Sequence, residues 1–315
     1  MPPIQRLPKT RKPLTDIGFI FDSYRDLTEK LGAVDGHAAT LALAARYFTD
    51  QSRLSTDDQA LGLSLAPGYG VSTRYVDLNN LSVHLNQLLI VATTKHAEDF
   101  LIRFRREQVA LGREWRGKDD GEDRLSFTLD CIGDGLAGNV ERIGDERYRL
   151  LQYYRLVRNA AAHQYEKRSR LDVEFEKVRQ FRDLVKDEYG LDAPNKFSDT
   201  QFDDHMLYTR LVKYLATDLC RLAPPETLEE FQRVLSNRIY FCHEPRSISK
   251  DKGDPERLKS SLSGFLKHHY NFQLDLYPTL QESLVQWIED IPTKRIRRRE
   301  QLGTLSDWVK NNVPS

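Results

Sequence analysis

Cysteine is scarce in this chain, and the cysteines that occur are far apart. Among 315 residues there are only Cys131, Cys220 and Cys242. None of them forms a CxxC pair or another zinc-binding spacing, so the pattern indicates neither a disulfide framework nor a structural zinc site. We therefore expect a reducing compartment, no metal site and no cofactor.

Net charge and long apolar runs are also lacking. Lys and Arg together number 47, equal to the 47 of Asp and Glu, so any surface that binds nucleic acid must be local. No stretch approaches the roughly 20 apolar residues that a membrane-spanning helix needs. Residues 1–14 hold prolines and basic side chains without an apolar core, which predicts a flexible basic arm rather than a secretory signal. We expect a cytoplasmic protein without a membrane partner.

A glycine-rich phosphate loop and internal repeats are missing as well, which counts against nucleoside-triphosphatase folds and solenoids. The hydrophobic share of 39% and the charged share of 30% are typical of a globular protein. What the chain does contain is helical periodicity. From Asp77 to about Glu107, apolar residues recur at three- and four-residue intervals without a proline or glycine among them, which predicts one long helix.

Helical patterns cover most of the remaining sequence, so we expect an all-α fold. Gly32 divides the first two expected helices, Thr15 or Asp16 caps the first of them, and a short strand competes at residues 238–242. The polar residues 195–204 suggest a boundary between a helical domain at 15–195 and a C-terminal helical region at 196–315. Besides the long helix, the expected helices span residues 15–31, 36–50, 125–136, 145–164, 171–189, 201–222, 227–236, 255–262, 274–289 and 293–311.

The most informative motif is the segment 158–163, Arg-Asn-Ala-Ala-Ala-His, near the end of an expected helix. An Arg-x4-His pair alone carries little information, because about one is expected by chance in this composition. Arg238 and His243 form a second such pair among apolar neighbours. The asparagine after Arg158 lowers the chance expectation to roughly 0.03, and the alanines leave the surroundings open. On a regular helix Asn159 and His163 share a face, whereas Arg158 lies about 140° around from His163.

An Arg-Asn-x3-His motif late in a helical bundle, after a long helix and a polar insertion, resembles the HEPN superfamily (higher eukaryotes and prokaryotes nucleotide-binding). Many members are metal-independent ribonucleases of toxin–antitoxin, CRISPR-associated and phage-defence systems. The resemblance implies a helical bundle that dimerises, so that two motifs share one cleft. It extends at most over residues 15–189 and is specific only around the motif, and residues 190–315 resemble no family. Gln164 stands where members often carry a glycine or another small residue.

The resemblance implies catalytic roles for Arg158, Asn159 and His163. His163 would take the proton of the RNA 2′-hydroxyl or protonate the leaving 5′-oxygen, which suits an imidazole. Arg158 would stabilise the charge that develops on phosphorus, and Asn159 would orient the histidine or the phosphate. The predicted function is a metal-independent endoribonuclease, a toxin or phage-defence effector that acts as a homodimer. An antitoxin or another defence-system protein is a further candidate partner.

Other interpretations stay open. The chain can be a non-catalytic helical module that binds RNA, a nucleotide or a regulatory protein, or an enzyme that an antitoxin restrains by nucleotidylation of Tyr165. The motif can also be an ordinary solvated helix end with a packed or capping histidine. On the long helix, Lys95, His96 and Asp99 could support His163, although a surface network explains them equally well.

Two basic clusters are candidate RNA-binding surfaces, because cationic side chains displace counterions from phosphates. One cluster lies at and just after the end of the long helix, and the other lies near the C-terminus. Either can equally be a solvated helix face. The residues concerned are Arg103, Arg105, Arg106, Arg113, Arg116, Lys294, Arg295, Arg297, Arg298 and Arg299.

Overall fold

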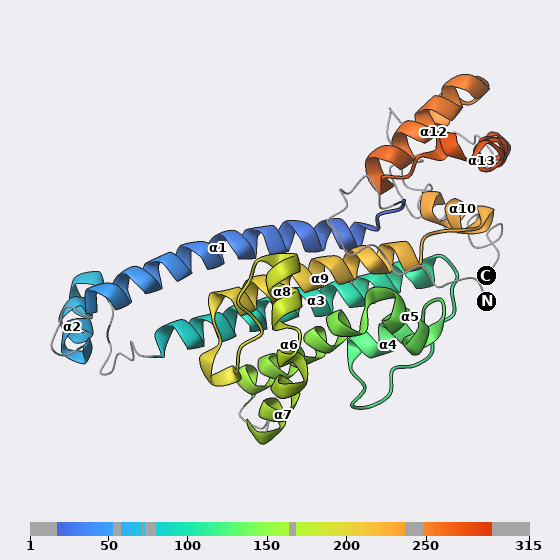
Figure 1. Cartoon of the computed structure of the whole chain (residues 1–315). Coiled ribbons are helices and arrows are strands. Elements are labelled where there is room, and N and C mark those ends of the chain that lie inside the picture. The colour runs from blue at the N-terminus through green and yellow to red at the C-terminus, as the bar shows by residue number, and fades with distance from the viewer. Residues whose placement is uncertain are drawn as a thin grey trace. The chain divides into compact units, whose positions relative to one another are not determined.

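The computed structural model describes residues 18–52, 58–70, 72, 80–163, 168–236 and 248–291. Over these ranges the regular structure is helical and contains no strand, so the expected all-α class is confirmed (Figure 1). Several predictions lie outside the described residues. These are the basic arm, the cap at Thr15 or Asp16, the strand at 238–242, the second Arg-x4-His pair, Tyr165 and the helix at 293–311.

The helices are named as in Figure 1. The α-helices are α1 (Asp22–Ser52), α2 (Asp58–Leu65), α3 (Leu81–Ala110), α4 (Arg124–Asp130), α5 (Gly135–Ile143), α6 (Asp145–Ala162), α7 (Arg168–Arg179), α8 (Arg182–Tyr189), α9 (Phe202–Leu222), α10 (Leu228–Ser236), α12 (Pro255–Tyr270) and α13 (Pro278–Asp290). Short 3₁₀ turns are η2 (Ala66–Tyr69), η3 (Phe197–Asp199), η4 (Ile248–Asp251) and η5 (Leu274–Leu276).

The predicted division at Gly32 is wrong, because α1 runs unbroken through Gly32 and Gly36. Each glycine costs a helix about 1 kcal/mol relative to alanine. The opposite face of α1 continues through both, however, with Leu27, Leu31 and Ala38 buried. Burial of that face outweighs the local preference, since tertiary packing supplies most helix stability in a folded protein.

The helix expected at 125–136 is also wrong, because α4 ends at Asp130 and α5 begins at Gly135. The buried Asn139 amide donates to the main-chain oxygens of Leu129 at 2.7 Å and Ile132 at 2.5 Å, and so holds the break. Gly133 has φ 50° in the same turn, a left-handed conformation that glycine adopts without strain. The segment expected as one helix at 171–189 likewise divides into α7 and α8.

Other boundaries match more closely. Helix α3 confirms the long helix over its described residues and ends at Ala110, three residues beyond the prediction. Helices α6, α9 and α10 begin and end within two residues of their predicted limits. Helix α12 is longer than expected, reaching Tyr270, and α13 begins at Pro278 after the 3₁₀ turn η5.

The chain forms two compact units. The first takes its described residues from Asp26–Phe100 and Val140–Ala216, and the second takes them from 18–25, Leu101–Asn139 and 217–291. The helices α1, α3 and α9 therefore contribute to both. Residues 195–204, which suggested a domain boundary, belong to the first unit.

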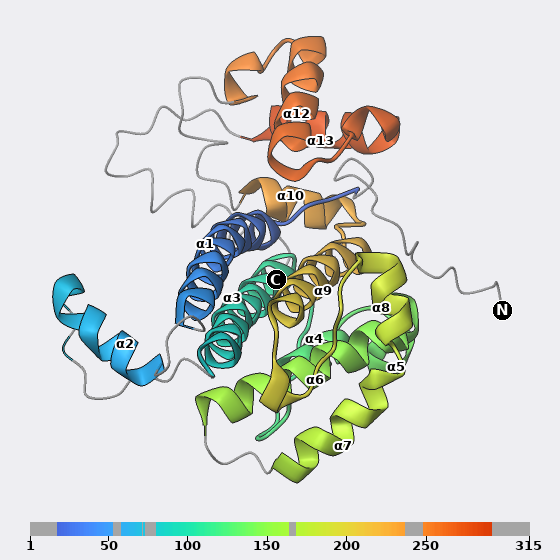
Figure 2. The same cartoon turned by 60° about the vertical axis from the view of Figure 1, so that its left-hand side comes forward.

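Helix α9 lies at the centre of the first unit, where α1, α3 and α9 run side by side in Figure 1 and Figure 2. Its apolar face is fully buried, and three neighbouring helices each bond to it. The bonds join Asp35 of α1 to Lys213 at 2.7 Å, Thr94 of α3 to Tyr208 at 3.0 Å, and Tyr154 of α6 to Asp204 at 2.8 Å. These contacts hold α6, which carries the motif, against the core.

The second unit is built around aromatic side chains. Phe19 stacks on Tyr270 with ring centres 4.9 Å apart, and Phe231 lies 4.8 Å from Phe272. The Arg25 guanidinium donates to the main-chain oxygens of residues 268 and 269, at the end of α12. Contacts between α10, α12 and α13 complete this unit.

Candidate active site

The motif lies at the C-terminal end of α6. Asp145 and Glu146 lie in the first turn of this helix, where negative side chains stabilise the helix by interacting with the positive end of its dipole. Leu150, Tyr153 and Val157 bury one face of it. The helix ends at Ala162, and His163 follows in extended conformation with φ −136° and ψ 120°.

His163 is the C-cap residue of α6, and its extended dihedral angles give its side chain a different direction, relative to Arg158, from the one a regular helix would impose. The His163 backbone N–H donates to the main-chain oxygen of Asn159 at 2.8 Å, and His163 is exposed. Ala160 and Ala161 are partly exposed and Ala162 is exposed. The imidazole is thus accessible from solvent at the end of the helix.

Arg158 and Asn159 contact each other directly. The Arg158 Nη1 donates to the Asn159 Oδ1 at 3.0 Å, and the Arg158 Nη2 lies 3.4 Å from the Glu98 Oε1. The Arg158 side chain is 25% exposed, and its Nε is buried without a hydrogen-bond partner. A guanidinium carries more N–H donors than these two contacts use, so Arg158 is held in place with donors remaining.

Glu98, on α3, is the contact that the sequence did not reveal. It lies sixty residues before Arg158, and no spacing rule connects two residues on different helices. Its neighbour Tyr208 is buried, which raises the pKa of the Tyr208 hydroxyl to about 12, and the Glu98 charge acts in the same direction. The Arg158 charge opposes it. Arg158, Glu98 and Tyr208 therefore form one electrostatic group where α3, α6 and α9 meet.

The polar residues proposed to support His163 are arranged differently. Lys95 and Asp99 form an ion pair with each other at 2.8 Å, one helical turn apart on α3. This bond lowers the pKa of Asp99. The His96 Nδ1 is buried and has no hydrogen-bond partner. On this helix the residue that contacts the motif is Glu98 rather than any of these three.

The first basic cluster divides by role. Arg103 and Arg106 are exposed on α3, while the Arg105 guanidinium lies 5.3 Å from the ring centre of Phe127 and 6.0 Å from that of Trp115. All three arginines belong to the second unit, whereas Arg158, Asn159 and His163 belong to the first.

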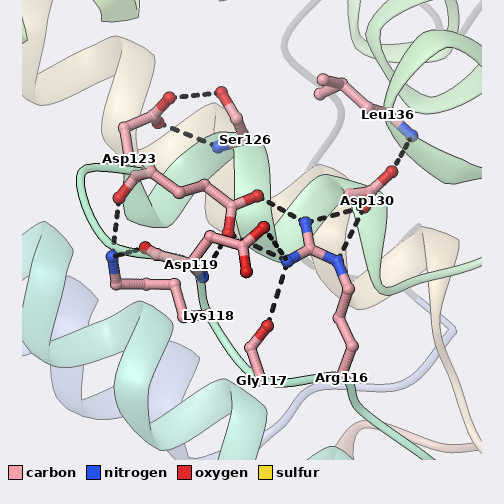
Figure 3. A network of polar contacts seen from close by, with 9 residues as sticks. Arg116, Gly117, Lys118, Asp119, Asp123, Ser126, Asp130 and Leu136 are labelled. Atoms are coloured by element: carbon pink, nitrogen blue, oxygen red, sulfur yellow. Dashed lines mark hydrogen bonds and ion pairs between the residues drawn. The ribbon is translucent and has the colours of Figure 1, made fainter.

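Arg113 and Arg116 are occupied by internal contacts. Arg113 donates to Glu230 at 2.6 Å and to the main-chain oxygens of residues 223 and 224. Arg116 binds Glu122 and, at 2.8 Å, Asp130 (Figure 3). The hydrogen bonds that Arg116 donates to the carboxylates of Glu122 and Asp130 raise the pKa of Arg116 further above its usual range. Both side chains join loop to helix within the second unit, so the structure does not support them as free RNA contacts.

The second basic cluster, from Lys294 through Arg295 and Arg297 to Arg299, lies outside the described residues. Within the described ranges, no group of three or more His, Cys, Asp and Glu side chains is arranged to hold a metal ion. No described helix combines the length and the apolar composition needed to cross a bilayer.

No protein-family model, curated protein or solved structure matches the chain. The resemblance to the HEPN superfamily therefore stays a prediction from the motif.

Proposed function

We propose that this protein is a metal-independent endoribonuclease of the HEPN type, in which Arg158, Asn159 and His163 act on RNA. The observation that supports it best is the end of α6, where Arg158 and Asn159 are bonded to each other and the exposed His163 stands just beyond the last helical residue. An anchored guanidinium and an accessible imidazole at the end of one helix are the types of group that suit phosphate chemistry.

The reaction needs only groups that RNA and the protein supply. His163 removes the proton from the 2′-hydroxyl, whose oxygen attacks the adjacent phosphorus. The bond to the 5′-oxygen breaks, and this oxygen takes a proton from His163 of the partner subunit. Arg158 stabilises the charge on the phosphoryl oxygens in the transition state, a contribution of several kcal/mol in comparable sites. The products are a 2′,3′-cyclic phosphate and a 5′-hydroxyl.

The Glu98 contact favours a second candidate, a non-catalytic module that binds RNA, a nucleotide or a regulatory protein. An ion pair at 3.4 Å offsets part of the Arg158 charge, which weakens its effect on a phosphate. In this alternative Arg158 fastens α6 to α3, and RNA that binds is not cut.

The test is cleavage of total RNA in the presence of EDTA. Arg158→Ala and His163→Ala should each lower the rate at least about 100-fold, with products that carry a cyclic phosphate. Arg179→Ala and His37→Ala are matched controls, because both residues are exposed on other helices of the first unit, and they should leave the rate unchanged.

Cleavage that requires a divalent metal, or that survives both motif substitutions, would rule out the proposed mechanism. RNA binding without cleavage by the wild type would favour the second candidate. Light scattering after size-exclusion chromatography should give the mass of a dimer, since one cleft requires two motifs.

A further inference from the structure

Helix α1 has an exposed face without charge in the first unit. Leu27, Leu31 and Ala38 bury one side of the helix. At about 100° per residue, the opposite side over roughly four turns is formed by Gly32, Ala33, Gly36, Ala39, Thr40, Leu43 and Tyr47. All seven residues are exposed, and we call them the uncharged face of α1. A helix side that meets solvent is ordinarily charged or polar, so this composition indicates a contact.

The chemistry of this face restricts what can cover it. Leu43 is 71% exposed and Tyr47 is 66% exposed, one helical turn apart. The Thr40 hydroxyl donates to the Gly36 main-chain oxygen at 3.1 Å, so its hydrogen bond is made within the helix. The face therefore offers apolar contact and the Tyr47 hydroxyl, but no charge for nucleic acid or for a charged protein surface. A helix that lies on a membrane carries several Lys or Arg residues beside its apolar face, whereas Arg46 is the one such residue in the last two turns of α1.

The uncharged face is complementary to itself when its direction is reversed. Its small residues, Gly32 and Gly36, lie toward one end, and its large ones, Leu43 and Tyr47, lie toward the other. An added Cβ at either glycine meets nothing within 4 Å, so the space above both is open. When two copies pack antiparallel about a twofold axis near Thr40, each Tyr47 lies over the gap between the two glycines of the other copy. Side chains of one helix that fill the gaps of another are the usual basis of helix packing.

We propose that two copies of this chain associate through the uncharged face of α1, as an antiparallel pair of helices. The twofold axis makes the contact isologous, so one surface serves both copies. The contact is about 24 Å long and buries on the order of 500 Å² per copy. A standard stable interface buries roughly 800 Å² per partner. The dissociation constant should therefore be about 10 to 100 µM, weaker than the micromolar limit of standard-size interfaces.

This pair is separate from the shared cleft of the proposed ribonuclease. Helices α3 and α9 lie between α1 and α6 in Figure 1 and Figure 2, so an α1 pair does not bring two motifs together. The proposal does not rest on RNA cleavage, and either proposal can fail without the other.

The first test is sedimentation equilibrium of the full chain from 1 to 300 µM. The wild type should show a reversible association step in this range. Leu43→Lys and Tyr47→Lys each place two like charges in the contact, so each should weaken the step at least tenfold. Both positions are exposed, and the circular dichroism spectrum should stay that of the wild type. Val173→Lys is the matched control, because Val173 is an exposed apolar residue of α7, and it should associate as the wild type does.

The second test locates the axis by disulfide formation under mild oxidation, with the wild type as background. Thr40→Cys places two thiols close to the axis and should form a covalent dimer. Arg46→Cys is exposed on the same helix, but its two copies lie about 16 Å apart along the pair. A disulfide needs Cα atoms within about 7 Å, so this variant should not cross-link.

Three results would each overturn the proposal. These are a protein that stays monomeric at 300 µM, association that Leu43→Lys and Tyr47→Lys leave unchanged, and equal cross-linking of Thr40→Cys and Arg46→Cys. A monomer that sediments with phosphatidylcholine vesicles would assign the face to a lipid surface instead.

Discussion

The buried Glu107 carboxyl should make the stability of this protein depend on pH in an unusual direction. Its pKa is about 7 in the folded protein, against an ordinary value of 4.5, because burial disfavours the charged form. Between these two values the folded state binds more protons than the unfolded state. This contribution to stability is therefore fully present below about pH 4.5, and it is lost as the pH rises through 7.

The size of the effect follows from the two pKa values. At about 1.4 kcal/mol per pH unit, a difference of this size corresponds to roughly 3 kcal/mol of stability lost once Glu107 is ionised. Most of that loss, about 2 kcal/mol or more, falls between pH 5 and pH 8. Glu107→Gln cannot ionise, and its amide oxygen still accepts from the Ser23 N–H. The free energy of unfolding of the variant, relative to that of the wild type, should therefore increase from pH 5 to pH 8.

The assay is urea unfolding of wild type and Glu107→Gln at pH 5, 6, 7 and 8. Subtraction of the two curves matters, because the buried His205 acts in the opposite direction: burial lowers its pKa to about 4. Its effect is the same in both proteins and cancels in the difference. Glu29→Gln, at an exposed position of α1, is the control. Its free energy of unfolding should differ from that of the wild type by the same amount at every pH. If the Glu107→Gln difference is constant to within about 0.5 kcal/mol from pH 5 to pH 8, the reasoning is refuted.

Two further predictions concern the first unit and its neighbouring turns. Gly32→Ala should raise the free energy of unfolding by about 0.5 to 1 kcal/mol, because an added Cβ meets nothing within 4 Å; Gly190→Ala should lower it, since that glycine has φ 67°. Thermal unfolding of the pair checks this, and equal shifts of both variants would contradict it. Tyr154→Phe removes one donor to Asp204 and should cost about 1 kcal/mol. Asp204→Ala should cost about 3 kcal/mol or more, because the buried Asn195 N–H, the Gln201 N–H and the buried Tyr154 hydroxyl all lose their acceptor. Equal losses from these two variants would show that the network is not what holds this region.

The predictable part of the fold comes from long, regular patterns. Helix α3 has apolar residues at helical spacing over about thirty positions and no interrupting residue, so local chemistry and packing agree. The errors occur where they disagree. Gly32 indicated a break that burial of Leu31 and Ala38 overrides, and the break after Asp130 depends on Asn139, whose role requires the folded turn.

The polar stretch 195–204 shows what composition by itself leaves undetermined. Its polar composition suggests a domain boundary, and in the structure Asp204 and Asn195 of this stretch are buried. Asp204 accepts hydrogen bonds from the Asn195 and Gln201 backbone N–H groups at 2.8 Å each. Burial raises its pKa, and these bonds oppose that change. A polar residue with several hydrogen-bond donors around it can be buried, but the amino-acid sequence does not identify those donors.

For the candidate site, the sequence by itself determined the residue types, their order and the likelihood that they recur by chance, and it placed them near the end of a helix. Only the tertiary structure decided that His163 leaves that helix and that Glu98 of α3 pairs with Arg158. It also decided that Arg113 and Arg116 are used internally and that Glu107 lines an aromatic cavity. The physical reason is range: helix periodicity depends on neighbours within one or two turns, whereas ion pairs and cavities join residues that the sequence separates.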